Sequence, residues 1–244
     1  MWVFYYLIKM QEKNNIINIV VVFLAAGLSN RFQEDKMFYN VGGKPLIVKS
    51  LENYIQFDDR ISSILIVSKS NEDNEKISKL VNEYFPLNKK KIYFTQGGIS
   101  RSESTLNALN YMQNNEISSD YIAITDGARC YVTNELLERL ISSLSMFDNA
   151  IPAIRRAETF KIIENGFIKR TLKNNYLYEI QTPQIFKTDK IIEAYKKGFY
   201  RKKWSPDDSA IYFSYFENEK INIVKGDVGN IKVTFKEDIK NNEI

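Results

Sequence analysis

The chain has 244 residues, of which 44% are hydrophobic and 26% charged, so it is a globular protein long enough to bury a sizeable core. It has no histidine and one cysteine, Cys130, which excludes histidine-based triads and metal sites, intrachain disulfides and cysteine-based zinc sites. The lone cysteine fits a reducing compartment, so we expect a cytoplasmic protein. A net charge of +4 is compatible with phosphate ligands but too small to indicate nucleic-acid binding.

Residues 1–15 are predicted to be an N-terminal extension. The apolar run at residues 1–8 is shorter than the roughly 20 residues that a membrane-spanning helix needs. It also lacks the basic start and the cleavage site of a signal peptide, so we expect no membrane association. An alternative hypothesis is that translation starts at Met10, which the intact mass of the natively expressed protein would test.

The first half of the chain alternates predicted strands and helices. Residues 16–24 are rich in β-branched side chains and end at turn-forming residues, which predicts a buried parallel strand. Further strands are predicted over residues 61–67, 91–95 and 121–124, and helices from Pro45, over 72–84, from the capping box at 100–103 and from Thr133. This alternation predicts an α/β fold with a mostly parallel twisted sheet and helices on both faces.

The pattern changes after residue 149. A strand is predicted over residues 150–154, and strands over 159–163 and 167–172 flank Asn165-Gly166, a strong hairpin signal. A hairpin is unstable alone, and a second subunit is the simplest surface for it to pack on. A helix over 188–199 and a strand over 221–224 follow. We therefore predict one domain over residues 16–244, with a protruding β-arm at about 152–178 that pairs two copies.

The loop after the first strand is a candidate phosphate site. In an open α/β sheet, ligands bind outside the carboxyl ends of the strands. Small residues at positions 25–27 let the backbone approach a ligand, and Arg31 and Lys36 add two cations. The loop matches neither the dinucleotide fingerprint nor the P-loop. The alternative is a small-residue turn with solvated charges.

Three later loops are predicted to lie near the same edge of the sheet. Residues 97–104 lead into a helix N-terminus, which suits a phosphate or another acceptor-rich ligand. Asp126 and Arg129 follow a strand, where the acid suits a sugar hydroxyl or Mg²⁺ and the cation a phosphate. Lys232 lies in the last loop, residues 226–234. The alternatives are a capped helix, a surface ion pair and a solvated lysine.

The motifs of these loops occur in a definite order. They are Ala25-Ala26-Gly27 with Arg31 and Lys36, Gly43-Lys44-Pro45, Gly97-Gly98 with Arg101 and Ser104, Asp126 with Ala128-Arg129, Glu158-Thr159-Phe160-Lys161, Gln181-Thr182-Pro183-Gln184, Asp207-Asp208, and Asn230-Ile231-Lys232-Val233-Thr234. Each is weak alone, but the ordered set resembles the 2-C-methyl-D-erythritol 4-phosphate cytidylyltransferases over about residues 19–239. The resemblance implies a Rossmann-like nucleotidyltransferase fold and a homodimer built through the β-arm.

The resemblance also implies the reaction. CMP passes from CTP to 2-C-methyl-D-erythritol 4-phosphate, giving 4-diphosphocytidyl-2-C-methyl-D-erythritol and pyrophosphate. The acceptor phosphate attacks the α-phosphorus in line, so positioning and charge stabilisation dominate. A phosphate monoester is already largely anionic at pH 7, so no histidine base is needed. Mg²⁺ is expected to bridge phosphate oxygens.

Residue roles follow from the same resemblance. Catalytic roles, clamping the triphosphate and the developing charge, fall to Arg31, Lys36 and Lys232. The residues expected around the nucleotide are Ala25, Ala26, Gly27, Gly98, Ser104 and Asp126. The residues expected to face the polyol phosphate are Asp126, Arg129, Thr159 and Thr182, the last reaching the partner's site. Asp126 is also the candidate metal residue, with Mg²⁺ held mainly through phosphates.

Several positions depart from the family pattern. A loop glycine, the proline before the catalytic lysine, a histidine and an arm arginine are replaced by Ser29, Asp35, Thr125 and Asn174. Lys173 or Arg170 are candidates to replace the arm arginine. The groups on the CTP side match better than those on the acceptor side. Two alternatives therefore stay open, a cytidylyltransferase for another polyol phosphate such as ribitol 5-phosphate, and a non-enzymatic nucleotide-binding homologue.

Overall fold

The computed structural model describes residues 17–27, 29, 31–32, 34–201 and 207–240. Its strands are β1 Ile19–Leu24, β2 Asn40–Val41, β3 Lys44–Pro45, β4 Ile61–Ser68, β5 Lys91–Gln96, β6 Tyr121–Asp126, β7 Asn149–Arg155, β8 Lys161–Glu164, β9 Phe167–Thr171, β10 Tyr178–Ile180, β11 Gln184–Lys187 and β12 Ile223–Lys225. Its helices are η2 Lys36–Phe38, α2 Leu46–Gln56, α3 Asn71–Tyr84, α4 Arg101–Asn114, α5 Asn134–Ser143, η3 Asn174–Tyr176, α6 Thr188–Tyr200, α7 Asp208–Tyr215 and α8 Glu237–Lys240. The predicted extension at residues 1–15 and the alternative start at Met10 lie outside the described residues.

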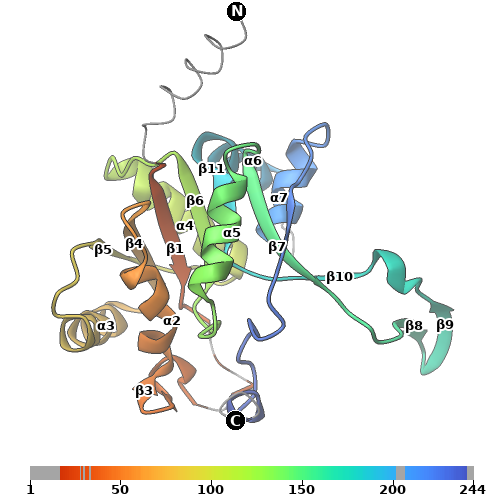
Figure 1. Ribbon diagram of the computed structural model, residues 1–244, viewed down its shortest axis with the longest axis horizontal. Coiled ribbons are helices and arrows are strands. Elements are labelled where there is room, and N and C mark those ends of the chain that lie inside the picture. The colour runs from red at the N-terminus through yellow and green to blue at the C-terminus, as the bar shows by residue number, and fades with distance from the viewer. Residues whose placement is uncertain (1–16, 28, 30, 33, 202–206, 241–244) are drawn as a thin grey trace, which may run out of the picture.

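An eight-stranded sheet forms the centre of the fold (Figure 1). Its order is β10-β7-β11-β6-β1-β4-β5, with β12 paired to β7. β1 runs parallel to β4 and β6, and β4 to β5, whereas β11 runs antiparallel to β6 and β7. The chain moves outward from β1 through β4 and β5 and then returns to β6 on the other side. This reversal creates a topological switch point at the carboxyl ends of β1 and β6, where α/β proteins bind ligands.

Helices cover both faces of the sheet, as predicted. On one face, Val21 and Phe23 of β1 pack into a core with residues of α2, α3 and α5. On the other face, Val20 and Val22 pack with residues of α4, α6 and α7. All four of these side chains are fully buried. Burial on both faces explains why this strand is continuously apolar instead of alternating. Among the described residues, no helix is both long and apolar enough to cross a membrane.

The predicted helix caps at Ser100 and Thr133 are confirmed. Ser100 Oγ accepts from the Glu103 N–H at 3.1 Å, and Thr133 Oγ1 from the Leu136 N–H at 3.1 Å. The capping box is not reciprocal, because the Glu103 carboxylate accepts from the Ile99 N–H at 3.0 Å instead of that of Ser100. This bond ties the loop at residues 97–100 to the first turn of α4.

The hairpin predicted at Asn165-Gly166 is also confirmed. Strands β8 and β9 pair antiparallel, and the turn residues have φ values of 51° and 83°. Figure 1 shows this hairpin projecting away from the central sheet, beyond β10. Its apolar side chains are exposed, with Phe167 at 78% and Ile168 at 61%. The fold therefore carries the predicted protruding β-arm.

Candidate active site

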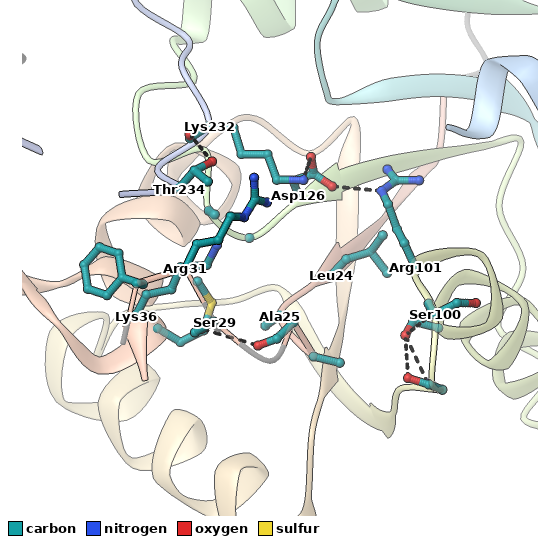
Figure 2. Close-up of a pocket in the computed structure, with 18 of the residues that line it drawn as sticks. Leu24, Ala25, Ser29, Arg31, Lys36, Ser100, Arg101, Asp126, Lys232 and Thr234 are labelled. Atoms are coloured by element: carbon teal, nitrogen blue, oxygen red, sulfur yellow. Dashed lines mark hydrogen bonds and ion pairs between the residues drawn. The ribbon is translucent and has the colours of Figure 1, made fainter. Parts of the chain in front are cut away.

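A cavity of about 610 Å³ lies at the switch point of the sheet (Figure 2). Its walls come from the loop after β1, the start of α4, the end of β6 and the segment after β12. Nine of the sequence-predicted site residues line it: Ala25, Ala26, Gly27, Arg31, Lys36, Gly98, Ser104, Asp126 and Lys232. The parallel strands thus bring together loops that are more than 200 residues apart in the sequence.

Asp126 is the electrostatic centre of the cavity. Its Oδ1 lies 3.0 Å from Arg101 Nε, and its Oδ2 lies 2.9 Å from Lys232 Nζ and 3.9 Å from Arg129 Nε. Burial raises the pKa of Asp126, but the nearby cations outweigh burial and hold that pKa below its ordinary value. The carboxylate is therefore ionised at neutral pH, and it holds Lys232 in place.

Lys36 reaches the cavity although the preceding residue is Asp35. Asp35 caps the short helix η2, since its Oδ1 accepts from the Met37 N–H at 3.2 Å, and its Oδ2 pairs with Lys69 Nζ at 2.7 Å. Lys36 Nζ donates to the Val233 carbonyl at 3.2 Å. Burial, and then the charge of Lys232, lower the pKa of Lys36. An anionic ligand between the two lysines would relieve their repulsion.

Gly97 lets the loop after β5 approach the loop after β1 closely. A Cβ on Gly97 would stand 2.4 Å from Ala26 Cβ, closer than real atoms approach. The neighbouring Gly98 N–H donates to Ser104 Oγ at 3.0 Å. Ser29 adopts a φ of 55° in the left-handed region, which costs a residue with a side chain about 1–2 kcal/mol. This close packing forms a floor to the cavity, lined by Ala26, Gly98 and Ser104.

Three predicted acceptor residues do not line the cavity. Arg129 is buried, and its Nη1 donates to the Asn230 carbonyl at 2.5 Å. Thr182 is buried, and its Oγ1 accepts from the Asp126 N–H at 3.0 Å. Thr159 is exposed at the start of the β-arm. One chain therefore assembles the predicted CTP side around the cavity, whereas the roles of these three residues stay predictions.

Thr125 is the residue expected, from the sequence resemblance, to replace a histidine. Its side chain is fully buried, and its Oγ1 forms a hydrogen bond with the Tyr54 hydroxyl at 2.9 Å. Tyr54 is itself fully buried in the core between the sheet and α2. Thr125 therefore contributes packing behind Asp126 and does not line the cavity.

Arg101 and Asp208 are site residues to which the sequence reasoning assigned no role. Arg101 lines the cavity, and its Nη2 lies 2.7 Å from Asp208 Oδ2. The signal in the sequence is a cation at the first residue of a capped helix, where the helix dipole disfavours positive charge. An arginine at such a place needs carboxylate partners, and these come from β6 and α7.

A cation-lined cavity at the switch point of a mixed α/β sheet suits a phosphate-bearing ligand, as a nucleotidyltransferase requires. The chain belongs to the 2-C-methyl-D-erythritol 4-phosphate cytidylyltransferase family, whose model matches residues 19–244. This result confirms the predicted family and the predicted enzyme class, a CTP-dependent cytidylyltransferase.

Individual relatives match nearly the full length of this chain. The 2-C-methyl-D-erythritol 4-phosphate cytidylyltransferase of Thermosipho africanus is 32% identical, over 91% of this chain and 95% of that protein. The crystal structure of 4-diphosphocytidyl-2C-methyl-D-erythritol synthase from Anaerococcus prevotii has a TM-score of 0.80 and 27% identity, covering 94% of this chain and 98% of that one. The bifunctional IspDF of Campylobacter jejuni is 29% identical, with a TM-score of 0.71, and the match covers 53% of its length.

Proposed function

We propose that this protein transfers CMP from CTP to 2-C-methyl-D-erythritol 4-phosphate, releasing pyrophosphate. The observation that carries the proposal is the set of four cationic side chains that line one cavity together with Asp126. Arg31, Lys36, Arg101 and Lys232 line one cavity at the switch point of the sheet. A triphosphate matches this charge, and the glycine-lined floor leaves room for a nucleoside.

The cations account for catalysis without a histidine. An acceptor phosphate oxygen forms a bond to the α-phosphorus of CTP while the bond from that phosphorus to the bridging oxygen breaks, and pyrophosphate leaves. Negative charge grows on the leaving group, where Arg31, Lys36 and Lys232 would stabilise it. The Val233 carbonyl holds Lys36, and Asp126 holds Lys232, before the substrate binds. The attacking phosphate is already anionic, so no proton has to be removed from it.

Mg²⁺ is proposed to bind mainly through the phosphates. Among the described residues, no group of three or more His, Cys, Asp or Glu side chains could hold a metal ion. Asp126 is the acid in the cavity wall, and its two oxygens already contact Arg101 and Lys232. One carboxylate beside a triphosphate fits Mg²⁺, which usually keeps several waters and few protein ligands. When bound, the ion would neutralise phosphate charge.

We propose a homodimer formed through the β-arm. The arm exposes apolar side chains, among them Ile163, Phe167 and Ile168, which a partner subunit would cover. Thr159 lies on this arm and does not line the cavity of its own chain, so its expected contact with the acceptor would be made in the partner's site. The buried single cysteine, Cys130, supports a cytoplasmic location.

Replacing Asn165 and Gly166 with two valines is expected to weaken dimerisation. Both positions have positive φ, which β-branched residues disfavour, so the hairpin loses its turn. Sedimentation velocity over a concentration series measures the change. Asn165→Asp is the matched control, since Asp-Gly forms the same turn, and it should sediment as the wild type does. An unchanged dimer in the double-valine variant would contradict the proposed interface.

Pyrophosphate release from CTP with Mg²⁺ tests the acceptor. We expect turnover with 2-C-methyl-D-erythritol 4-phosphate and little with ribitol 5-phosphate, because the family match covers residues 19–244. A clear preference for ribitol 5-phosphate would overturn this acceptor but keep the cytidylyltransferase. Binding of CTP without turnover on any polyol phosphate would instead favour the non-enzymatic alternative.

A further inference from the structure

A chain of buried polar contacts links helix α6 to the cavity. The Tyr195 hydroxyl donates to Asp208 Oδ1, and Asp208 Oδ2 lies 2.7 Å from Arg101 Nη2. Arg101 Nε then lies 3.0 Å from Asp126 Oδ1, and Asp126 Oδ2 lies 2.9 Å from Lys232 Nζ (Figure 2). Tyr195 and Asp208 are fully buried, behind the cavity wall. The contacts therefore run from the protein interior to a lysine proposed to act on the triphosphate.

Neither helix capping nor a gain in stability explains why a carboxylate is buried at position 208. The cap of α7 is Asp207, whose Oδ1 accepts from the Ala210 N–H at 2.8 Å. Burying an ionised carboxylate is costly, and a buried ion pair stabilises a fold no more than well-packed apolar side chains of similar volume do. The inward-facing Asp208 therefore calls for a different reason, and its direct contact with Arg101 supplies one.

Arg101 depends on two carboxylates for its orientation. It is the first residue of α4, where Ser100 supplies the cap and the helix dipole disfavours a cation. Asp126 binds its Nε and Asp208 binds its Nη2, so the planar guanidinium is held at two separate atoms. With Asp208 absent, Arg101 would keep one anchor and would be free to rotate about it.

We propose that Asp208 is a positioning residue for CMP transfer, holding Arg101 so that Asp126 stays directed at Lys232. This inference rests on the proposed function. Lys36 is held by the Val233 carbonyl and Arg31 also lines the cavity, and neither is held through Asp208, so ground-state binding of CTP should change little. The placement of Lys232 against the developing charge should suffer, and a misplacement of about 1 Å can cost about 10²-fold in rate.

Asp208→Asn and Tyr195→Phe test the inference in the full-length protein. We expect kcat to fall about 10- to 100-fold in Asp208→Asn and several-fold in Tyr195→Phe, with the KM for CTP within about threefold of wild type. Circular dichroism and thermal unfolding report whether each variant is folded. If Asp208→Asn does not fold, Tyr195→Phe decides, because it removes only the hydroxyl that orients Asp208.

Tyr212→Phe is the matched control. Tyr212 is fully buried in α7, and its hydroxyl donates to Glu219 Oε2 at 2.6 Å, outside the chain of contacts to the cavity. It should lose stability to a similar degree as Tyr195→Phe but keep the wild-type kcat. Equal losses of kcat in the two tyrosine variants, or a folded Asp208→Asn with normal kcat, would overturn the inference. Absence of CTP turnover in the wild type would overturn the proposed function and the inference with it.

Discussion

Lys36→Ala and Lys232→Ala variants are each expected to turn over CTP about 10²–10³ times more slowly than the wild type. Both lysines line the cavity and are held before substrate arrives, Lys36 by the Val233 carbonyl and Lys232 by Asp126. Such preorganised charges stabilise a transition state more than a substrate. The loss should therefore appear mainly in kcat, measured by pyrophosphate release at saturating CTP.

The fold should survive the change at Lys36. Burial and the nearby Lys232 lower the pKa of Lys36, which means that its charge lies in an unfavourable environment in the absence of a ligand. Lys236→Ala is the matched control, because Lys236 pairs with Glu34 and does not line the cavity. Near-normal turnover in either active-site variant, or an equal loss in the control, would contradict the assigned roles.

The architecture was predictable because its signals are local. The apolar run before residue 25, the caps at Ser100 and Thr133 and the positive-φ pair Asn165-Gly166 each specify an element through nearby residues. Strand β11, Gln184–Lys187, was not predicted, since it has four residues and no hydrophobic alternation. It forms by pairing antiparallel between β6 and β7, and its Gln184 side chain is buried. Such a strand depends on tertiary contacts that no short window contains.

The site was predictable to the extent that topology brings strand ends together. Loops after parallel strands meet at one edge, so Arg31, Lys36 and Asp126 were expected to be neighbours, and they line one cavity. The role proposed for Asp208 was not predictable, because it depends on a contact with Arg101, 107 residues earlier. Thr159 was assigned from resemblance alone, and its role depends on where a second subunit lies.

Asp126→Asn is expected to lower turnover at least about 10²-fold and to destabilise the fold. The variant leaves Arg101 and Arg129 without their shared anion while both stay largely buried. Removing one partner of a buried pair costs about 3–5 kcal/mol, and we expect a value near the lower limit because Lys232 is partly exposed. Urea unfolding at pH 7 measures the loss. Glu72→Gln, at an exposed helical ion pair, should unfold almost as the wild type does.

The stability difference between wild type and Asp126→Asn should also depend on pH. The folded-state pKa of Asp126 lies below that of the unfolded chain, because the cations outweigh the opposing effect of burial. Its ion pairs therefore contribute their full stability above the unfolded pKa of about 3.9, and this contribution is lost as pH falls through the folded-state value. The difference in unfolding free energy should be constant from neutral pH down to about pH 5 and should shrink only in stronger acid. A difference that vanished between pH 7 and 5 would mean that Asp126 is not held by its cations as the structure places it.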